Sequence, residues 1–347
     1  MKILIISDAW HPQINGVVRT YEHLETVLVQ QGHTVKVIGP HDFRWRMPMP
    51  GYREIELALF PYQRLARLIE DFAPDSIHIA TEGPLGMAAQ KWCLRYDRRF
   101  STAFHTMFPD YFAKRVAKFC KPLYGAARNF GTHLVRKFHN QSALVITTTP
   151  SINEILRDWE ITAPLVAIPR GVPVDLFTPE GPRALGPMEK PTALFVGRVA
   201  IEKNIEAFLD MPWEGLKIVV GDGPSLTFLS NKYPDVMFVG RKVGQELAKW
   251  YRSADIFAFP SRTDTFGIVL IEALSCGIPV AAYPVPGPRD IITSPLLGTL
   301  DEDLSLAAQK ALQATGNKDK KHEIMRQNYT WEAFTKHFLE ALHTHQC

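Results

Sequence analysis

Short apolar runs recur along the chain, and the stretches between them carry apolar residues at a helical period. The runs are continuous rather than alternating, which is typical of parallel strands that are covered on both faces. Alternation of such strands with helices predicts doubly wound α/β domains with right-handed crossover connections. The ten runs form two series of five, which begin at Lys2, Thr34, Ser76, Ser101 and Ala143, and at Thr192, Leu216, Val236, Ile256 and Pro279.

A segment rich in proline and glycine separates the two series. Residues 177–192 contain four prolines and two glycines, which is typical of a linker between domains. A chain of 347 residues, of which 46% are hydrophobic, can bury two cores of ordinary size. We therefore predict a first domain over residues 1–176, a linker over 177–191 and a second domain over 192–328. A final amphipathic helix is predicted over residues 329–347.

The chain lacks the sequence features of membrane-spanning, secreted or disulfide-rich proteins. No apolar run approaches the roughly 18 residues that a membrane-spanning helix needs. The first apolar run is short and meets Asp8, which predicts a strand rather than a signal peptide. The four cysteines are scattered without CxxC spacing, which argues against a disulfide framework or a thiolate metal site. These observations favour a cytosolic protein.

Two carboxylates lie eight residues apart after the ninth predicted strand. Asp264 lies in the loop that follows the strand, and Glu272 lies on the next helix. Between them, Thr265, Phe266 and Gly267 place backbone N–H groups at the start of that helix. Carboxylates accept hydrogen bonds from hydroxyls, and helix-start N–H groups donate to anions, so the segment suits a polyhydroxylated, anionic ligand. The alternative is that Asp264 caps the helix and Glu272 is a solvated side chain.

A glycine turn and two cations also follow predicted strands. Asn15 and Gly16 follow the first strand, where the N–H groups of the next helix could contact a diphosphate. The alternative is an ordinary strand-to-helix turn. Arg198 and Lys203 lie five residues apart after the sixth strand, so both could contact a pyrophosphate. The alternative is a solvated pair near Glu202.

A basic, aromatic-rich stretch covers residues 111–140. It contains seven Lys or Arg residues, two His residues and no acid, with aromatic and aliphatic residues interleaved. Such a stretch suits adsorption to anionic lipid headgroups, and we assign this contact to Lys114, Arg115, Lys118 and Lys121. The alternative is a pair of ordinary helices whose apolar residues pack on the first domain. Nothing else in the chain suggests a nucleic-acid-binding fold, so no nucleic-acid partner is expected.

These motifs resemble those of retaining family-4 glycosyltransferases, which have the GT-B fold. Residues 261–282 resemble the acidic-x7-Glu signature of the family, although Asp264 stands where the family usually has Glu. Gly16 matches a glycine-containing loop of the family. Arg198 and Lys203 match its diphosphate-binding Arg and Lys. The resemblance covers nearly the whole chain.

The resemblance implies two Rossmann-like, doubly wound domains facing each other across a cleft, with the C-terminal helix crossing back to the first domain. His105 ends the fourth predicted strand and matches a His that contacts the donor sugar, although a lone histidine is often a structural residue. The catalytic residues implied by the family are His105, Asp264, Arg198 and Lys203. The implied nucleotide-sugar contacts are Gly16, Arg198, Lys203, Asp264, Thr265, Phe266, Gly267 and Glu272.

Other glycosyltransferases bind a divalent metal through a DxD motif, which residues 301–303 also spell. A helical pattern follows this motif directly, so we interpret it as a helix cap. The family implies that cationic side chains stabilise the leaving diphosphate in place of a metal. We therefore expect no catalytic metal and no cofactor, with the nucleotide sugar as a co-substrate.

The resemblance also implies transfer of a sugar from a nucleoside-diphosphate sugar with retention of configuration. Several stretches are most similar to bacterial diacylglycerol glycosyltransferases and their sulfolipid-forming relatives. With the basic stretch, this favours a UDP-sugar donor such as UDP-glucose or UDP-glucuronate, a membrane lipid such as diacylglycerol as acceptor, and peripheral binding to the cytoplasmic face of a membrane. The alternatives are a GDP-mannose-dependent α-mannosyltransferase acting on a lipid or polysaccharide, a sugar-nucleotide epimerase, and a non-catalytic sugar-nucleotide binder.

Overall fold

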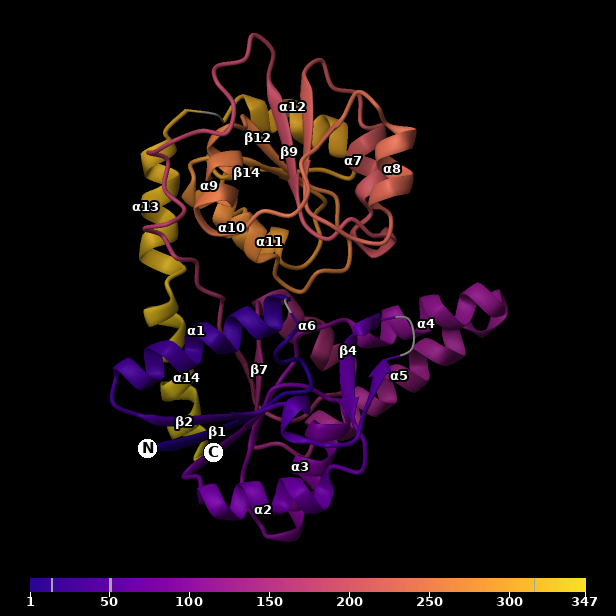
Figure 1. Ribbon diagram of the computed structural model, residues 1–347, viewed down its shortest axis with the longest axis vertical. Helices are drawn as coiled ribbons and strands as arrows, with labels where there is room; N and C mark the ends of the chain where they lie inside the picture. Colours follow the sequence, from indigo (N-terminus) through magenta and orange to yellow (C-terminus); the bar gives the residue numbers. More distant parts are fainter. Residues whose placement is uncertain (14, 50–51, 315) are drawn as a thin grey trace. The chain divides into compact units, whose positions relative to one another are not determined.

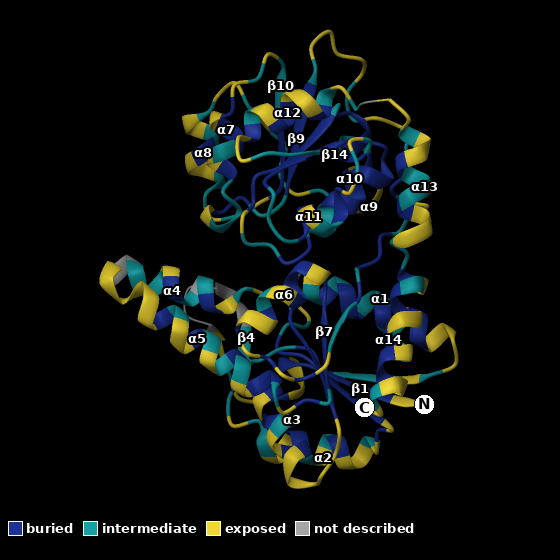
Figure 2. Ribbon diagram, turned by 180° about the vertical axis from the view of Figure 1, so that it is seen from behind, coloured by how far each residue is buried: buried dark blue, intermediate teal, exposed yellow. Residues whose placement is uncertain are grey.

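The computed structural model divides the chain into two compact units, and each is described by itself (Figure 1). The first unit comprises Met1–Pro169 together with Trp331–Cys347, and the second comprises Arg170–Thr330. In each unit a parallel sheet is covered by helices, and Figure 2 shows the strands as the most buried elements. The residues that the structure describes are 1–13, 15–49, 52–314 and 316–347.

The first unit is built on a six-stranded parallel sheet with the strand order β2-β1-β5-β6-β7-β8. Successive residues of β1 pack on opposite faces, so Ile5 joins the core under α1 and α14, and Leu4 joins the core under α2 and α3. The strands of this sheet are β1 (Lys2–Ile6), β2 (Thr34–Ile38), β5 (Ser76–Ile79), β6 (Ser101–Ala103), β7 (Leu144–Thr147) and β8 (Leu165–Ala167). The helices are α1 (Gly16–Gln30), α2 (Tyr62–Phe72), α3 (Pro84–Arg95), α4 (Phe108–Phe119), α5 (Tyr124–His139), α6 (Pro150–Asp158) and α14 (Trp331–His345).

The second unit repeats this plan with the strand order β11-β10-β9-β12-β13-β14, again all parallel. Leu194 of β9 packs on the side of α9 and α10, and the next residue, Phe195, packs on the side of α7, α8 and α12. The strands are β9 (Thr192–Val196), β10 (Leu216–Val220), β11 (Met237–Phe238), β12 (Ile256–Phe259), β13 (Val280–Ala282) and β14 (Gly298–Leu300). The helices are α7 (Ile205–Asp210), α8 (Leu226–Lys232), α9 (Gly244–Arg252), α10 (Ile268–Ser275), α11 (Pro288–Ile291), α12 (Leu304–Leu312) and α13 (Lys318–Asn328).

The predicted doubly wound α/β architecture is confirmed, and each of the ten predicted strands is present. The sequence pattern does not predict the three-residue edge strands β8 and β14, or the antiparallel hairpin of β3 (Arg46–Met49) and β4 (Tyr52–Ala58). The final helix, α14, packs into the core of the first unit through Trp331, Phe334 and Phe338, as the resemblance implies. Among the described residues, no helix is both long enough and apolar enough to cross a membrane.

A buried carboxylate, Asp8, ties the end of β1 to the start of α3. It accepts hydrogen bonds from the backbone N–H groups of Leu85 (2.9 Å) and Gly86 (3.3 Å). It also accepts one from the hydroxyl of Thr81 (3.0 Å). A Cβ atom at Gly83 would lie 2.4 Å from Cγ of Asp8, so the turn requires glycine there. Burial raises the pKa of the Asp8 carboxyl to about 6, although the hydrogen bonds from Leu85, Gly86 and Thr81 oppose the rise.

The raised pKa of Asp8 predicts a specific pH dependence of stability. Between its ordinary pKa of 3.8 and about 6, the folded state keeps a proton that the unfolded state releases. The free energy of unfolding should therefore fall as the pH rises through this window, by up to about 3 kcal/mol from this group. The free energy of unfolding can be measured with urea at several pH values. Its dependence on pH in this window should be less negative for Asp8→Asn than for the wild type, and unchanged for the exposed control Asp71→Asn. An unchanged slope in Asp8→Asn would contradict the assignment.

Candidate functional site

Side chains join two loops at the carboxyl edge of the second sheet. The loop after β9 contains the 3₁₀ turn Ile201–Lys203, and the loop after β12 contains Asp264. Nζ of Lys203 donates a hydrogen bond to Oδ1 of Asp264 at 2.5 Å, and Nδ2 of Asn204 donates one to the carbonyl oxygen of Pro260 at 3.0 Å. The Lys203 and Asp264 side chains are only 28% and 17% exposed. Residues that lie 61 positions apart in sequence thus form one partly buried cluster.

The second carboxylate oxygen of Asp264 is buried without a hydrogen-bond partner among the described residues. The hydroxyl of Ser261, in the same loop, is also buried and has no hydrogen-bond partner among the described residues. Buried polar atoms without partners are rare, and an acceptor and a hydroxyl in one loop suit a ligand that carries hydroxyl groups. The N-cap of α10 is Gly267, at a φ of 86°, so the alternative in which Asp264 caps this helix is wrong. Thr265 and Phe266 precede the helix and are buried.

Glu272 lies on α10 and is 3% exposed, so the alternative of a solvated side chain is wrong. Its Oε2 accepts a hydrogen bond from the hydroxyl of Tyr251 at 2.8 Å. Tyr251 belongs to α9 and is fully buried. Sequence reasoning does not single out Tyr251, because its hydroxyl reaches Glu272 across two packed helices. The carboxylate is therefore oriented by the protein.

The loop that carries Arg198 rests on the turn after β10. A Cβ atom at Gly221 would lie 1.8 Å from the carbonyl oxygen of Gly197, so these backbones meet without room for a side chain. The N–H of Val199 donates to the carbonyl oxygen of Asp222 at 2.9 Å. Nε of Arg198 lies 3.8 Å from a carboxylate oxygen of Glu202, as in the alternative of a cation pair near Glu202. Lys203 instead donates its hydrogen bond to Asp264. The turn after β10, residues 221–224, thus supports the loop that carries Arg198.

The DxD motif is a helix cap, as predicted. Asp303 is the N-cap of α12, and its carboxylate accepts from the N–H of Ser305 at 2.8 Å. Asp301 pairs with Lys310 at 3.0 Å. Within the described part of the chain, no group of three or more His, Cys, Asp or Glu side chains is placed to hold a metal ion.

Two predicted site residues belong to the first unit. Gly16 is the exposed first residue of α1, and the side chain of Asn15 accepts from the N–H groups of Val17 (2.9 Å) and Val18 (3.0 Å). The side chain of Asn15 therefore competes with a diphosphate for the helix-start N–H groups of Val17 and Val18. His105 is half-buried after β6, and its Nε2 lies 2.9 Å from the hydroxyl of Tyr21, a partner that the sequence does not reveal.

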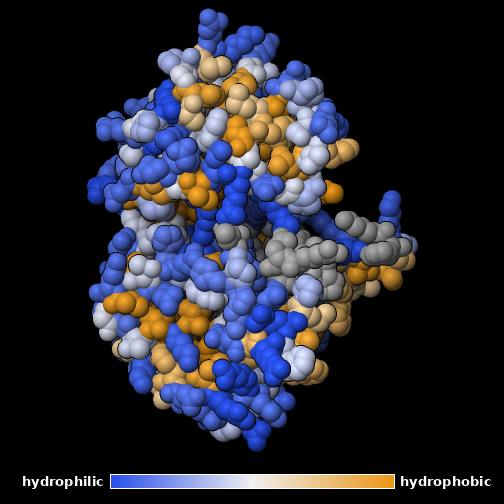
Figure 3. All heavy atoms as spheres, in the orientation of Figure 1, coloured by the Kyte–Doolittle hydropathy of each residue, from blue (hydrophilic) through white to orange (hydrophobic). Residues whose placement is uncertain are grey.

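The basic stretch forms a helical hairpin of α4, the 3₁₀ turn Lys121–Leu123 and α5. Lys114 and Lys121 are exposed, and Arg115 is half-buried. Lys118 lies on α4, but its side chain is outside the part of the structure that is described. In the space-filling view, hydrophilic and hydrophobic side chains lie together at the projecting end of this hairpin, outside the grey region (Figure 3). The hairpin is therefore amphipathic on its surface.

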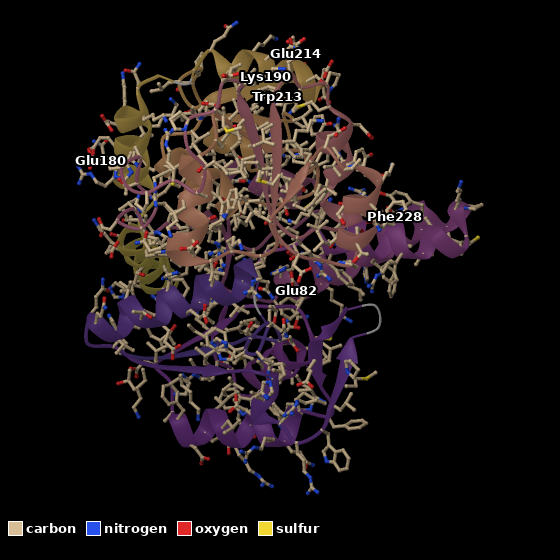
Figure 4. The ribbon with its side chains drawn as sticks, turned by 45° about the horizontal axis from the view of Figure 1, so that its top comes forward. Glu82, Glu180, Lys190, Trp213, Glu214 and Phe228 are labelled. Carbon is tan, nitrogen blue, oxygen red and sulfur yellow. The ribbon has the colours of Figure 1, made fainter. Side chains whose placement is uncertain are left out.

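The opposite edge of the second sheet has a different character. Lys190, Trp213 and Glu214 mark the loops that enter β9 and β10 (Figure 4). Nε1 of Trp213 donates to the carbonyl oxygen of Pro191 at 3.0 Å, which closes this end of the sheet. Strands in a parallel sheet all run one way, so the candidate site residues gather at the carboxyl edge alone. A groove of about 340 Å³ beside β8 and α14 in the first unit is lined by none of them.

Comparisons with known proteins agree with this picture. Residues 14–176 match the family model described as Glycosyltransferase Family 4, and residues 190–314 match Glycosyl transferases group 1. The chain is 26% identical to the alpha-monoglucosyldiacylglycerol synthase of Streptococcus pneumoniae over 95% of this chain and 83% of that protein. It is 29% identical to the GDP-mannose-dependent alpha-mannosyltransferase of Mycobacterium tuberculosis over 86% of this chain and 83% of that protein. The solved structure of Anabaena Alr3699/HepE in complex with UDP-glucose is similar with a TM-score of 0.70 at 16% identity, over 99% of this chain and 100% of that one, which shows the GT-B fold.

The buried bond between Tyr251 and Glu272 predicts a clear stability effect. Tyr251→Phe removes the hydroxyl and leaves a buried carboxylate without this donor, so the free energy of unfolding should fall by about 1–3 kcal/mol. Tyr233→Phe is a matched control, because its hydroxyl also bonds a carboxylate, that of Asp210 at 2.6 Å, but in an exposed setting. Urea denaturation should show a change below about 0.5 kcal/mol for this control. Equal effects of the two variants would contradict a special role for the buried bond.

Proposed function

The chain belongs to the glycosyltransferases of family 4, and from this premise we propose that it moves a hexosyl group from a UDP-sugar to a hydroxyl of a membrane lipid, with retention of configuration. The donor sugar is glucose or glucuronic acid in this proposal, and the lipid is of the diacylglycerol kind. One observation carries the catalytic part of the proposal. It is the Lys203–Asp264 pair, with a second Asp264 oxygen that is buried and unpartnered among the described residues.

The pair suits a nucleotide sugar because it presents both kinds of group that such a donor needs. Oδ2 of Asp264 would accept hydrogen bonds from hydroxyls of the donor sugar. Lys203 and Arg198 would stabilise the charge that develops on the leaving diphosphate, with Arg198 able to donate two parallel hydrogen bonds. Because Asp264 already holds Lys203 in place, little reorganisation is needed when that charge appears.

Glu272 has a binding role in this proposal. Ribose hydroxyls are donors that a buried carboxylate can accept, and Tyr251 fixes the orientation of the carboxylate before the donor binds. Thr265, Phe266 and Gly267 would bring backbone N–H groups to the diphosphate at the start of α10. The family resemblance assigns Gly16 to the diphosphate and His105 to the sugar, and both residues belong to the first unit. A nucleotide sugar would thus be held through its ribose, its diphosphate and its hexose.

The transfer step needs no protein nucleophile. The acceptor hydroxyl oxygen forms a bond to the anomeric carbon on the same face from which the diphosphate departs. The bond between that carbon and the diphosphate oxygen breaks, and the hydroxyl proton passes to a phosphate oxygen of the leaving group. The products are a glycolipid and a nucleoside diphosphate. Trapping of a covalent sugar–protein adduct would contradict this step.

Support for the donor and the acceptor comes from similar proteins. A structurally similar Anabaena protein was solved with UDP-glucose, and a similar streptococcal protein is named as a synthase of a glucosylated diacylglycerol. The similarity to a GDP-mannose-dependent mannosyltransferase supports a second candidate with equal weight, namely transfer of mannose from GDP-mannose. The two candidates share the cation and carboxylate chemistry of the site and differ in the base and the sugar.

A direct assay separates these candidates. Purified protein is incubated with radiolabelled UDP-glucose, UDP-glucuronate or GDP-mannose over diacylglycerol vesicles, and the extracted lipids are counted. Lipid that is labelled from a UDP-sugar is the expected result. Lipid that is labelled from GDP-mannose alone would instead support the second candidate. Label only in a water-soluble acceptor would overturn the lipid assignment, and conversion of the donor without an acceptor would indicate an epimerase. Binding of UDP without turnover would indicate a non-catalytic binder.

The same assay tests the role of the ion pair. Lys203→Met should lower turnover roughly ten- to a hundredfold, since a charge-assisted bond worth ~1.5–3 kcal/mol is lost as charge develops. Lys232→Met is a matched control in the same unit, because Lys232 pairs with Glu206 at 2.9 Å on the exposed surface. This control should keep wild-type turnover. Equal turnover of Lys203→Met and wild type would remove Lys203 from the mechanism.

The α4–α5 hairpin would place the protein on the cytoplasmic face of an anionic membrane. Phe130 and Leu123 are 55% and 49% exposed, and Lys114 and Lys121 lie on the same hairpin. The ring of Phe112 lies 6.2 Å from that of Phe130 and bridges the two helices. Exposed aromatic and aliphatic side chains can enter the headgroup layer while lysines contact lipid phosphates.

Vesicle binding tests this surface. Changing Lys114 and Lys121 to Glu should weaken binding to phosphatidylserine vesicles at least roughly thirtyfold, because each lysine near an anionic surface contributes about 1 kcal/mol. Changing the exposed Lys190 and Lys320 to Glu alters the net charge equally and should leave binding unchanged. Equal loss in both variants would show attraction by net charge rather than docking of the hairpin.

A further inference from the structure

A buried histidine holds a carboxylate at the carboxyl edge of the first sheet. Nε2 of His139 lies 3.1 Å from Oε1 of Glu82, and because an ionised carboxylate only accepts, the ring N–H is the donor. The His139 side chain is 0% exposed, whereas that of Glu82 is 26% exposed. Glu82 lies in the turn between β5 and α3 (Figure 4). Its carboxylate is therefore held from inside the protein and can still be reached from solvent.

The ring of His139 is itself fixed by its neighbours. Its Nδ1 lies 2.8 Å from the hydroxyl of Thr102 on β6, and that hydroxyl lies 3.1 Å from the hydroxyl of Ser142. Thr102 is fully buried, and Ser142 is buried as well. The ring of Phe104 packs edge-on against the His139 ring, with centroids 6.0 Å apart. A ring with these contacts has little freedom to turn, so it keeps the Glu82 carboxylate in one orientation.

The turn that carries Glu82 is fixed on both sides of this residue. The hydroxyl of Thr81 donates to the carboxylate of Asp8 at 3.0 Å and accepts from the N–H of Asp8 at 2.7 Å. On the other side, a Cβ atom at Gly83 would lie 2.4 Å from Cγ of Asp8. The residues before and after Glu82 are thus both held against one buried carboxylate. A binding residue needs this kind of preorganised support.

Glu82 and His105 lie in loops that follow neighbouring strands. Glu82 follows β5 and His105 follows β6, and these strands pair in parallel. Paired strands lie about 4.8 Å apart, so the loops that follow them are adjacent at the carboxyl edge. Phe104, the residue before His105, contacts the His139 ring that holds Glu82. In the proposed function His105 contacts the hexose that is transferred, so a side chain on the adjacent loop can reach the acceptor that must meet this hexose.

We propose that Glu82 binds the acceptor by accepting a hydrogen bond from a headgroup hydroxyl other than the one that reacts, and that His139 positions Glu82 for this contact. This inference rests on the proposed function. An ionised carboxylate repels the donor diphosphate and suits an uncharged group with O–H donors. The reacting hydroxyl gives its proton to a phosphate oxygen, so the bond to Glu82 comes from a second hydroxyl. The preferred acceptor is then a diacylglycerol lipid with an uncharged hexosyl headgroup rather than diacylglycerol itself.

Binding of a soluble probe tests this site without any sugar transfer. Octyl glucoside, used below the concentration at which it forms micelles, combines a hexosyl headgroup with one alkyl chain. In calorimetric titrations Glu82→Gln should weaken its binding roughly tenfold or more, because a charge-assisted hydrogen bond is lost. The amide oxygen of the variant accepts from His139, so its NH2 group faces the probe. Binding of UDP should be unchanged, which also shows that the variant is folded.

Glu340→Gln is a matched control for this titration. Glu340 also lies beside a histidine, His337 at 3.2 Å, but both side chains are 56% exposed on α14. The control should bind octyl glucoside as the wild type does. Binding that is absent in the wild type, or equal in Glu82→Gln and the wild type, would overturn the inference.

Two substitutions of His139 test its positioning role. His139→Gln keeps an N–H donor near the place of Nε2 and should keep probe binding close to the wild-type value. His139→Phe keeps a ring but removes the donor, so it should weaken probe binding about as much as Glu82→Gln does. Urea unfolding shows whether each variant is folded. Loss of probe binding in a folded His139→Gln protein would overturn the positioning role.

Transfer to two lipids tests the acceptor class. The KM of the wild-type protein should be roughly tenfold lower for glucosyldiacylglycerol than for diacylglycerol. Glu82→Gln should lose most of this difference and keep the wild-type KM for the donor. Equal KM values of the wild type for the two lipids would overturn the preference. If the wild-type protein transfers no sugar to any acceptor, the proposed function fails, and the probe titration still decides whether Glu82 binds a hexosyl headgroup.

Discussion

Both units obey one constraint, namely that a polar side chain inside a buried parallel sheet needs a hydrogen-bond partner there, as His78 on β5 finds in Ser101 on β6. Residues 3–6 of β1 and all of β12 are covered on both faces, and their side chains are apolar. Their backbone groups are used by the neighbouring strands, so the polar side chains that follow them are confined to the edge where the strands end. Asp8, His105, Lys203 and Asp264 all lie in or next to such loops. The chemistry of this chain is therefore located by the topology.

Within that constraint, side chains join the loops after β9 and β12 in the second unit, and backbone joins the loops after β9 and β10. The Lys203–Asp264 pair and the bond from Asn204 to Pro260 span the loops after β9 and β12. An ion pair at this depth gains from the reduced dielectric but also bears a desolvation cost, so its net stabilisation is small. The main effect of the ion pair is on geometry, because each of the two side chains holds the other in position. The loop after β9 gains a second support where Gly197 and Gly221 meet.

The parts of this arrangement that follow from local pattern could be predicted from the sequence. Continuous apolar runs identify the ten central strands, and their ends locate the residues of the candidate site. The three-residue edge strands β8 and β14 are too short to give a pattern, and the β3–β4 hairpin lies outside the alternating plan. Tyr251 and Tyr21 were missed because a hydrogen bond between packed elements leaves no spacing in the sequence. Likewise, the capping of Val17 and Val18 by Asn15 depends on a side-chain rotamer.

The first unit is assembled from two pieces of chain that are separated by the whole second unit. Trp331, Phe334 and Phe338 complete a core that also contains Ile3 and Ile5. During synthesis on the ribosome, the strands of the first unit emerge early, but the helix that seals one side of their sheet is translated only after the whole second unit. Until then an apolar surface stays open to water, and the nascent chain is exposed to chaperones and to aggregation. The second unit, which is continuous, can fold first, so the order of maturation is the reverse of the order of translation.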